Sequence, residues 1–162
     1  AIESSFRHDA VSRVGALGLM QITPVVAREQ DILLSARPEE NIRTGIAHFT
    51  KKLKRIRGRT HDDTIKLSLA AYNVGLGHLR DAQKLAIAND LSPRRWDHVR
   101  KMFLLLEDPQ YRSEATYGYC HGSAVVAYVT RVMQQYQKYA ALYPKPPIQV
   151  SEASFATVDP RT

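Results

Sequence analysis

Two short clusters in this sequence hold the residue types that acid catalysis on a bound ligand requires. The first begins with a carboxylate, Glu3, and ends in the run Gly18-Leu19-Met20-Gln21. That run places an amide and a thioether beside backbone that glycine allows a ligand to approach closely. The second cluster, Ala71-Tyr72-Asn73, lies some fifty residues later and is followed by a glycine-rich turn at 74–77. We interpret the two clusters as walls of one active site in which Glu3 is the acid.

Glu3 alone would be an ordinary solvated residue near a helix end. Its context favours another interpretation, since Ser4-Ser5-Phe6, a turn-prone loop and the Gly-Leu-Met-Gln run follow it. A carboxyl group that is walled by apolar and aromatic groups has a raised pKa, because desolvation disfavours its charged form. Such a group can act as a general acid at neutral pH, and we expect this role for Glu3.

Composition indicates one globular domain with a polyanionic partner. The 162 residues carry a net charge of +7, which favours nucleic acid, an anionic membrane or an acidic cell-wall polymer without choosing among them. One cysteine, Cys120, excludes an internal disulfide. No apolar run approaches the roughly 20 residues of a transmembrane segment, and no signal peptide is present. Ala1-Ile2 resembles the end of a helix, so we expect the chain to be a fragment of a longer polypeptide.

Helix signals predict an all-α fold over residues 1–142. We expect helices at about 24–30, 38–58, 62–73, 77–89, from Ser92-Pro93 onward, and 123–142, with an irregular tyrosine-rich loop at 108–121. Asp62 or Asp63 is the expected cap of the third helix. On the second helix, steps of three and four predict this buried face: Ile42, Ile46, Phe49, Leu53 and Ile56. The proline-rich composition of 143–162 predicts an extended or disordered tail.

The order and spacing of these motifs resemble the catalytic domain of the soluble lytic transglycosylase-like (SLT) family. Glu3-Ser4, Ser12 in the loop that follows, and the Gly-Leu-Met-Gln and Ala-Tyr-Asn runs match successive motifs of that family. The resemblance covers about residues 1–142 and implies a goose-lysozyme-like helical fold. It is most similar to a membrane-bound subgroup whose N-terminal regulatory domain resembles periplasmic solute-binding proteins. It therefore also implies a periplasmic protein, associated with the outer membrane through a missing N-terminal part.

The resemblance implies cleavage of the β-1,4 bond between N-acetylmuramic acid and N-acetylglucosamine in peptidoglycan glycan strands. The product would be a 1,6-anhydromuramoyl end, with Glu3 acting as acid and then as base while the substrate's own acetamido oxygen stabilises the developing cation. No cofactor is implied. The substrate-binding positions that it implies are Ser12, Gly18, Met20, Gln21, Tyr72, Asn73 and Tyr128. Gln21 would offer both a donor and an acceptor to the sugar.

Several alternatives remain open at this level. Asp9 would be the candidate base of a hydrolytic muramidase, although a turn role also explains it. A peptidoglycan-binding module with a weakened site is a third possibility. Asn73 and Gly75 could simply close a helix. Tyr128 could be a core residue, because Ala124-Val125-Val126 stands where the family often has Glu-Thr-Arg ahead of this tyrosine.

The basic run at 51–59 favours a solvated helix end, where cations are stabilised by the helix dipole. If it binds a ligand, anionic peptide stems of the cell wall and phosphates are both possible. We expect no nucleic-acid partner, because no recognition helix with base-reading residues is present. The six histidines and Cys120 lack metal-ligand spacing, so we expect no metal.

Overall fold

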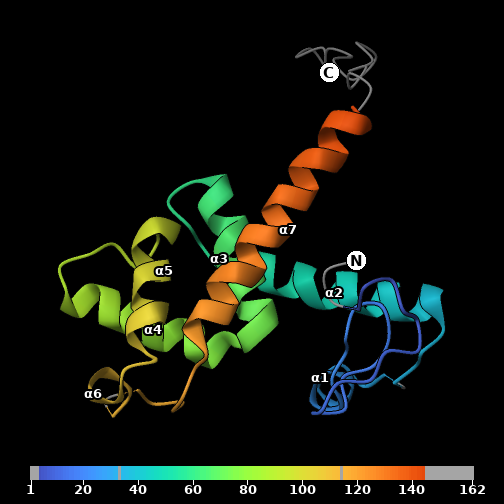
Figure 1. Cartoon of the computed structure of the whole chain (residues 1–162), viewed down its shortest axis with the longest axis horizontal. Coiled ribbons are helices and arrows are strands. Elements are labelled where there is room, and N and C mark those ends of the chain that lie inside the picture. The colour runs from blue at the N-terminus through green and yellow to red at the C-terminus, as the bar shows by residue number, and fades with distance from the viewer. Residues whose placement is uncertain (1–3, 33, 114, 145–162) are drawn as a thin grey trace, which may run out of the picture.

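The computed structural model describes residues 4–32, 34–113 and 115–144. Within these ranges every regular element is a helix, which confirms the all-α prediction (Figure 1). The helices are α1 (Pro24–Glu29), α2 (Pro38–Arg55), α3 (His61–Val74), α4 (Leu76–Ala88), α5 (Trp96–Leu105), α6 (Pro109–Arg112) and α7 (Gly122–Leu142). None of the helices in the described part of the chain is long and apolar enough to cross a membrane.

Helix α3 forms the centre of the hydrophobic core. It packs against α2, α4, α5 and α7, and its Leu67, Ala70 and Ala71 are fully buried. Phe103 of α5 and Val129 of α7 belong to the same buried cluster. Burial of these apolar side chains is the main stabilising term for this part of the molecule.

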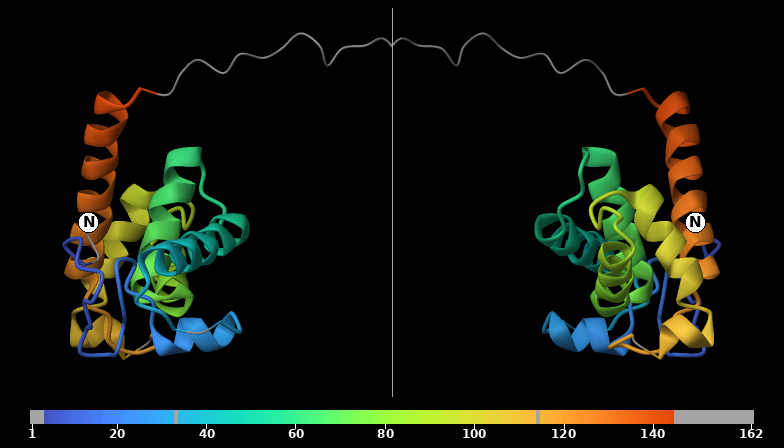
Figure 2. Two further views of the ribbon diagram at one scale, coloured as in Figure 1. Left: turned by 90° about the vertical axis from the view of Figure 1, so that its right-hand side faces the viewer. Right: turned by 90° about the vertical axis from the view of Figure 1, so that its left-hand side faces the viewer.

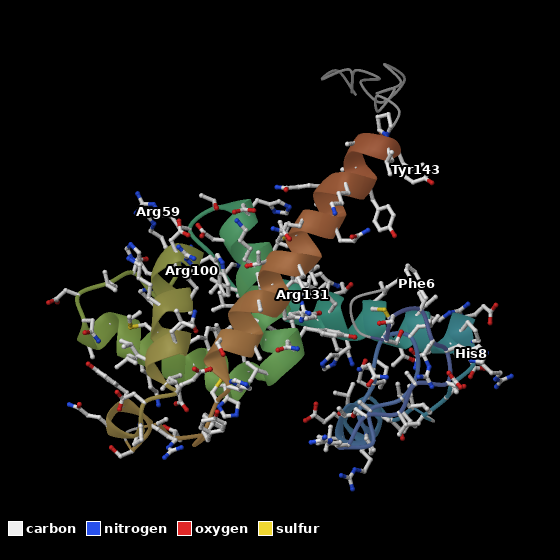
Figure 3. All side chains as sticks on the ribbon, viewed as in Figure 1. Phe6, His8, Arg59, Arg100, Arg131 and Tyr143 are labelled. Carbon is white, nitrogen blue, oxygen red and sulfur yellow. The ribbon has the colours of Figure 1, made fainter. Side chains whose placement is uncertain are left out.

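Residues 4–23, here called the N-terminal segment, precede α1 without regular secondary structure. Two isolated antiparallel bridges, Val11 with Leu17 and Leu17 with Ile22, and several turn hydrogen bonds between backbone groups shape the segment. Figure 1 shows this segment and α1 gathered beside α2, on the right of the view, away from α4 and α5. Phe6 and His8 extend from it toward solvent in Figure 3.

Two helix starts differ from the sequence prediction. The cap of α3 is Thr60, whose hydroxyl accepts from the Asp63 backbone N–H while the Asp63 side chain accepts from that of Thr60. Helix α5 begins at Trp96 and not at Pro93. Its first N–H donates to Asp63 Oδ1 at 2.7 Å, so a carboxylate of α3 replaces the local cap.

The buried face of α2 also differs from the prediction. Its buried residues are Asn41, Gly45 and His48, whereas Ile42 and Ile46 are 39% and 56% exposed. The predicted stripe was therefore wrong at these two isoleucines. The physical reason is that α2 packs its polar face against the N-terminal segment, whose backbone groups require hydrogen-bond partners.

Helix α7 is the longest element and extends beyond the other helices at its C-terminal end (Figures 1 and 2). Tyr143, which follows it, lies at this far end in Figure 3 and is exposed. The predicted loop at 108–121 contains the single turn of α6. Of the predicted tail, residues 145–162 lie outside the described residues.

Candidate active site

The Gly-Leu-Met-Gln run is fixed by one buried side chain, Asn41 of α2. The Met20 backbone N–H donates to Asn41 Oδ1 at 2.7 Å, and Asn41 Nδ2 donates to the carbonyls of Leu17 and Ser35 at 2.9 and 3.0 Å. Asn41 is only 2% exposed. Because a buried polar group is costly when unpaired, these bonds tie the run firmly to α2.

Two glycines make this close approach possible. Gly18 has φ +80°, and a Cβ added to it would lie 2.6 Å from Asn41 Cγ. A Cβ on Gly45 of α2 would lie 2.7 Å from Cγ of Met20. Both distances are too short for carbon atoms. The glycine that sequence reasoning placed near a ligand therefore serves first to admit the Asn41 side chain.

A hydrogen bond joins the two predicted clusters. Tyr72 Oη, on α3, donates to the Met20 carbonyl at 3.0 Å across 52 residues of sequence. The Tyr72 ring also meets His48 and Phe49 edge-on, with ring centroids 5.5 and 6.0 Å apart. Tyr72 is thus positioned by both α2 and the N-terminal segment.

Gln21 and Asn73 line a cleft of about 240 Å³ together with Tyr72 and His48. The other lining residues, mainly apolar, come from the N-terminal segment and α1: Val14, Ala16, Ile22, Thr23 and Val26. We call this hollow the polar cleft. Its position between the two sequence clusters makes it the candidate ligand site.

The Gln21 amide is oriented by the N-terminal segment itself. Gln21 Nε2 donates to the carbonyls of Ala10 and Gly18 at 3.0 and 2.9 Å, and the residue adopts φ +48°. Both N–H groups are therefore engaged within the protein. The expectation that Gln21 offers a donor and an acceptor was wrong in its first half, since only the carbonyl oxygen has capacity left for a ligand.

Tyr72 also lines a second hollow of about 380 Å³, here called the apolar groove. Met20, Tyr72 and Tyr128 line it, and its remaining residues come from α2, α3 and α7: Ile46, Phe49, Leu69, Val132, Gln135, Tyr136 and Tyr139. Tyr128 is only 6% exposed. Met20 and Tyr128 therefore share a hollow with Tyr72 but not with Gln21 and Asn73.

Ser12 lines neither of these two hollows. Its Oγ accepts from the Ala16 backbone N–H at 3.0 Å and so shapes the loop that carries the bridges. Glu3 lies outside the described residues. Ser4, which follows it, is 8% exposed, and its hydroxyl forms no hydrogen bond among the described residues. Asp9 is exposed and lies 3.6 Å from Arg7 Nε.

His48 is buried as a neutral ring beside the polar cleft. Burial, with a smaller contribution from the positive charge of Lys52, lowers its pKa to about 4. Gln30 Nε2 lies 3.1 Å from Nδ1, where a neutral imidazole can accept a hydrogen bond. Sequence reasoning missed both His48 and Asn41. The spacing of Asn41, Gly45, His48 and Lys52 along one side of α2 was the available signal.

The described part of the chain shows neither a metal site nor a reactive thiol. No three His, Cys, Asp or Glu side chains there come together in a way that could hold a metal ion. Cys120 is buried, and burial raises the pKa of its thiol to about 11, so it is a poor nucleophile at neutral pH.

Comparisons with known proteins indicate the same family as the order of the sequence motifs. Residues 1–92, more than half of the chain, match the family described as Transglycosylase SLT domain. A protein of Desulfosudis oleivorans named membrane-bound lytic murein transglycosylase F is 36% identical over 135 residues, which is 83% of this chain and 30% of that protein. Proteins of the same name from Hahella chejuensis and Cellvibrio japonicus are 38% and 39% identical, over 83% and 86% of this chain and 26% and 28% of their own lengths.

The resemblance to a membrane-bound subgroup that the sequence suggested is carried by the residues between Trp96 and Tyr117 and by the run Tyr117-Gly118-Tyr119, and the comparisons confirm it. The chain spans less than a third of the length of each of these relatives. Its motif order, its helical fold and the match over residues 1–92 lead to one conclusion. The chain belongs to the transglycosylase SLT domain family.

Proposed function

We propose that this chain is the catalytic module of a peptidoglycan lytic transglycosylase. It cleaves the β-1,4 bond between N-acetylmuramic acid and N-acetylglucosamine and leaves a 1,6-anhydromuramoyl end. Family membership supports the reaction class, and relatives named lytic murein transglycosylase support the substrate. The proposal extends to a periplasmic location, association with the outer membrane, and an N-terminal solute-binding-like regulatory domain in the full-length protein.

One observation carries this proposal, namely the hydrogen bond from Tyr72 to the Met20 carbonyl. It unites two clusters that lie far apart in sequence into one wall, with Gln21 and Asn73 facing the polar cleft beside it. Four apolar residues share the cleft wall with polar groups that converge on it from Gln21, Thr23, His48, Tyr72 and Asn73. Such convergent polar groups fix the orientation of a bound ligand.

Glu3 is the proposed acid and base. In the first step its proton passes to the glycosidic oxygen as the bond from C1 to that oxygen breaks. The acetamido oxygen of the same sugar stabilises C1 in place of an enzyme nucleophile. In the second step the Glu3 carboxylate takes the proton of the 6-hydroxyl, whose oxygen bonds to C1. The proton lost by Glu3 is thereby restored, and no water is consumed.

Gln21 and Asn73 are the proposed sugar contacts in the polar cleft. Because both N–H groups of Gln21 are engaged, the sugar group opposite its Oε1 must be a donor, such as a hydroxyl or the acetamido N–H. Tyr72, Tyr128 and Met20 are proposed to shape the neighbouring part of the site, with Gly18 and Ser12 fixing the loop.

Mass spectrometry of the soluble products tests the proposal. Purified peptidoglycan is digested with this chain, and the muropeptides are compared before and after borohydride reduction. The proposal requires products lighter by one water than hydrolytic ones, with no reducible end. Reducible ends would instead identify a muramidase. A complete absence of products would contradict an active module and favour a binding role.

The variant Glu3→Gln tests the acid directly. It should lose nearly all turnover, a fall of at least about 10³-fold, while retaining glycan binding. The matched control is Asp9→Asn, which changes the exposed carboxylate paired with Arg7 and should leave turnover unchanged. Equal activity of Glu3→Gln and wild type would refute the assignment.

A further inference from the structure

A third hollow, of about 460 Å³, lies where the end of α1, the last turns of α2 and the start of α4 meet. We call it the basic pocket. Four cationic side chains of α2 line it: Lys51, Lys52, Lys54 and Arg55. Glu29, Gln30, His48, Ile56 and Leu76 complete the lining. Its volume lies within the usual range for small-ligand sites, about 300–1,000 Å³.

The charges in the basic pocket are not balanced within the protein. The lining holds four cations and one carboxylate, that of Glu29, and His48 adds no charge because its ring is neutral. Among the described residues, ion pairs within 4.0 Å form elsewhere, for example between Lys66 and Asp62, but none includes these four cations. The pocket therefore has the electrostatic character of an anion site.

A solvated helix end explains only part of this arrangement. Lys52, Lys54 and Arg55 lie in the last turn of α2, where the helix dipole favours cations. That effect does not require burial, yet burial lowers the pKa of Lys52. A cation that is held partly out of water beside an open cavity, rather than extended into solvent, gains most when an anion binds.

The basic pocket adjoins the polar cleft. His48 lines both hollows, and α1 contributes Val26 to the cleft and Glu29 to the pocket. The contact between His48 and Tyr72, with ring centroids 5.5 Å apart, continues this wall to the candidate active site. A ligand in the cleft can therefore extend a substituent past His48 into the pocket.

We propose that the basic pocket binds the carboxylates of the peptide attached to the muramic acid of the strand being cleaved. This inference rests on the proposed function, because it requires a glycan in the polar cleft. Each such peptide leaves the glycan at the lactyl group and carries several carboxylates. The pocket is then a specificity site that favours strands with peptides over bare strands.

The test compares two substrates and two double variants. The substrates are glycan strands with intact peptides and the same strands after amidase treatment has removed the peptides. The test variant is Lys51→Gln/Lys52→Gln. The matched control, Lys101→Gln/Lys138→Gln, removes the same charge from exposed positions on α5 and α7 that do not line the pocket.

On peptide-bearing strands the test variant should show KM raised about tenfold with kcat little changed, the effect of losing a charge-assisted contact. On bare strands it should match wild type, and the control variant should match wild type on both substrates. An equal loss on both substrates, or an equal loss in the control, would overturn the proposal.

Equilibrium binding separates this proposal from the proposed function. Binding of both strand types is measured in the Glu3→Gln background by sedimentation, with the free peptide and with inorganic phosphate as competitors. Tighter binding of peptide-bearing strands that depends on Lys51 and Lys52 supports the pocket even when no strand is cleaved. Displacement by phosphate as effective as by the peptide would identify a general anion site and overturn the peptide assignment.

Discussion

The N-terminal segment and the helical core keep their shapes by different means. In the core, α3, α5 and α7 bury apolar side chains such as Leu67, Phe103 and Val129. Many weak contacts between these side chains together stabilise the core. The N-terminal segment has few buried apolar groups and depends on a small number of polar bonds, above all those of Asn41. The candidate site lies where the N-terminal segment meets the helical core. We therefore expect the loss of a single polar side chain to disturb the candidate site more than the loss of a single apolar contact disturbs the core.

The largest expected effect comes from Asn41→Leu. The change keeps the number of side-chain heavy atoms and the branching at Cγ but leaves the Met20 N–H and the Leu17 and Ser35 carbonyls without their partner. We expect a loss of about 3 kcal/mol in the free energy of unfolding and at least about 100-fold in kcat/KM. Urea denaturation and turnover on peptidoglycan measure the two.

Phe103→Leu is the matched change in the core, where the residue is fully buried in α5. It should cost about 1–1.5 kcal/mol and leave turnover intact, since neighbouring side chains can close part of the space. The two activities are compared at equal concentrations of folded protein. If Asn41→Leu and Phe103→Leu then lose the same fraction of activity, the proposed difference between the N-terminal segment and the core is wrong.

Gly18→Ala should destabilise the protein less than Asn41→Leu does. The residue must keep a left-handed conformation, and the added Cβ must also displace Asn41. We expect a loss of about 2 kcal/mol by thermal or chemical unfolding. Gly118→Ala is the control, because its φ of +77° is nearly the same as the +80° of Gly18 and nothing lies within 4 Å of its Cβ. The difference between the two isolates the collision with Asn41, and a difference of zero would argue against a tight fit.

His48 should make stability depend on mild acid. Its pKa is about 4 in the folded protein and 6.5 in the unfolded chain, so only the unfolded chain gains a proton between those values. Stability should therefore fall as pH drops from 6.5 toward 4, by on the order of 1–2 kcal/mol at pH 5. Urea denaturation at pH 7 and pH 5 should show this loss in wild type but not in His48→Gln. The control, His8→Gln, changes an exposed histidine and should keep the loss.

The smallest effect belongs to the start of α7. Hydrogen bonds from the Ser123 side chain and backbone N–H, together with His121, lower the pKa of Glu107 to about 2 from 4.5. The stability that these bonds supply is complete above pH 4.5 and is lost as pH falls through 2. Glu107→Gln should be slightly less stable than wild type at pH 7 and equal to it near pH 2. A constant difference across this range would contradict the assignment.

The sequence predicted the helices well because their signals are local. Thr23-Pro24 and Pro38 mark helix starts by their own backbone preferences, and the observed α1 and α2 begin at those prolines. The start of α5 could not be predicted in this way. Its cap is Asp63, a residue of α3 that lies more than thirty positions earlier.

The candidate site was predictable in its residue types but not in its supports. Gln21, Tyr72 and Asn73 come together at the polar cleft as the motifs indicated. Asn41 and His48 were missed because periodicity assigned the apolar side of α2 to the core, whereas this helix buries its polar side against irregular backbone. The roles of Glu3, Ser12, Met20 and Tyr128 in binding or catalysis stay predictions.

The bond between Tyr72 and Met20 also has a consequence for the order of folding. It closes a loop of 52 residues, and the Asn41 bonds that tie the same segment to α2 also join residues more than twenty positions apart, so these bonds form only after the entropy of closure has been met. We therefore expect φ-values near zero at Asn41 and Met20 and intermediate values in α3 and α5. Newly made protein would then acquire its core before its cleft, so that partly folded chains carry no competent site.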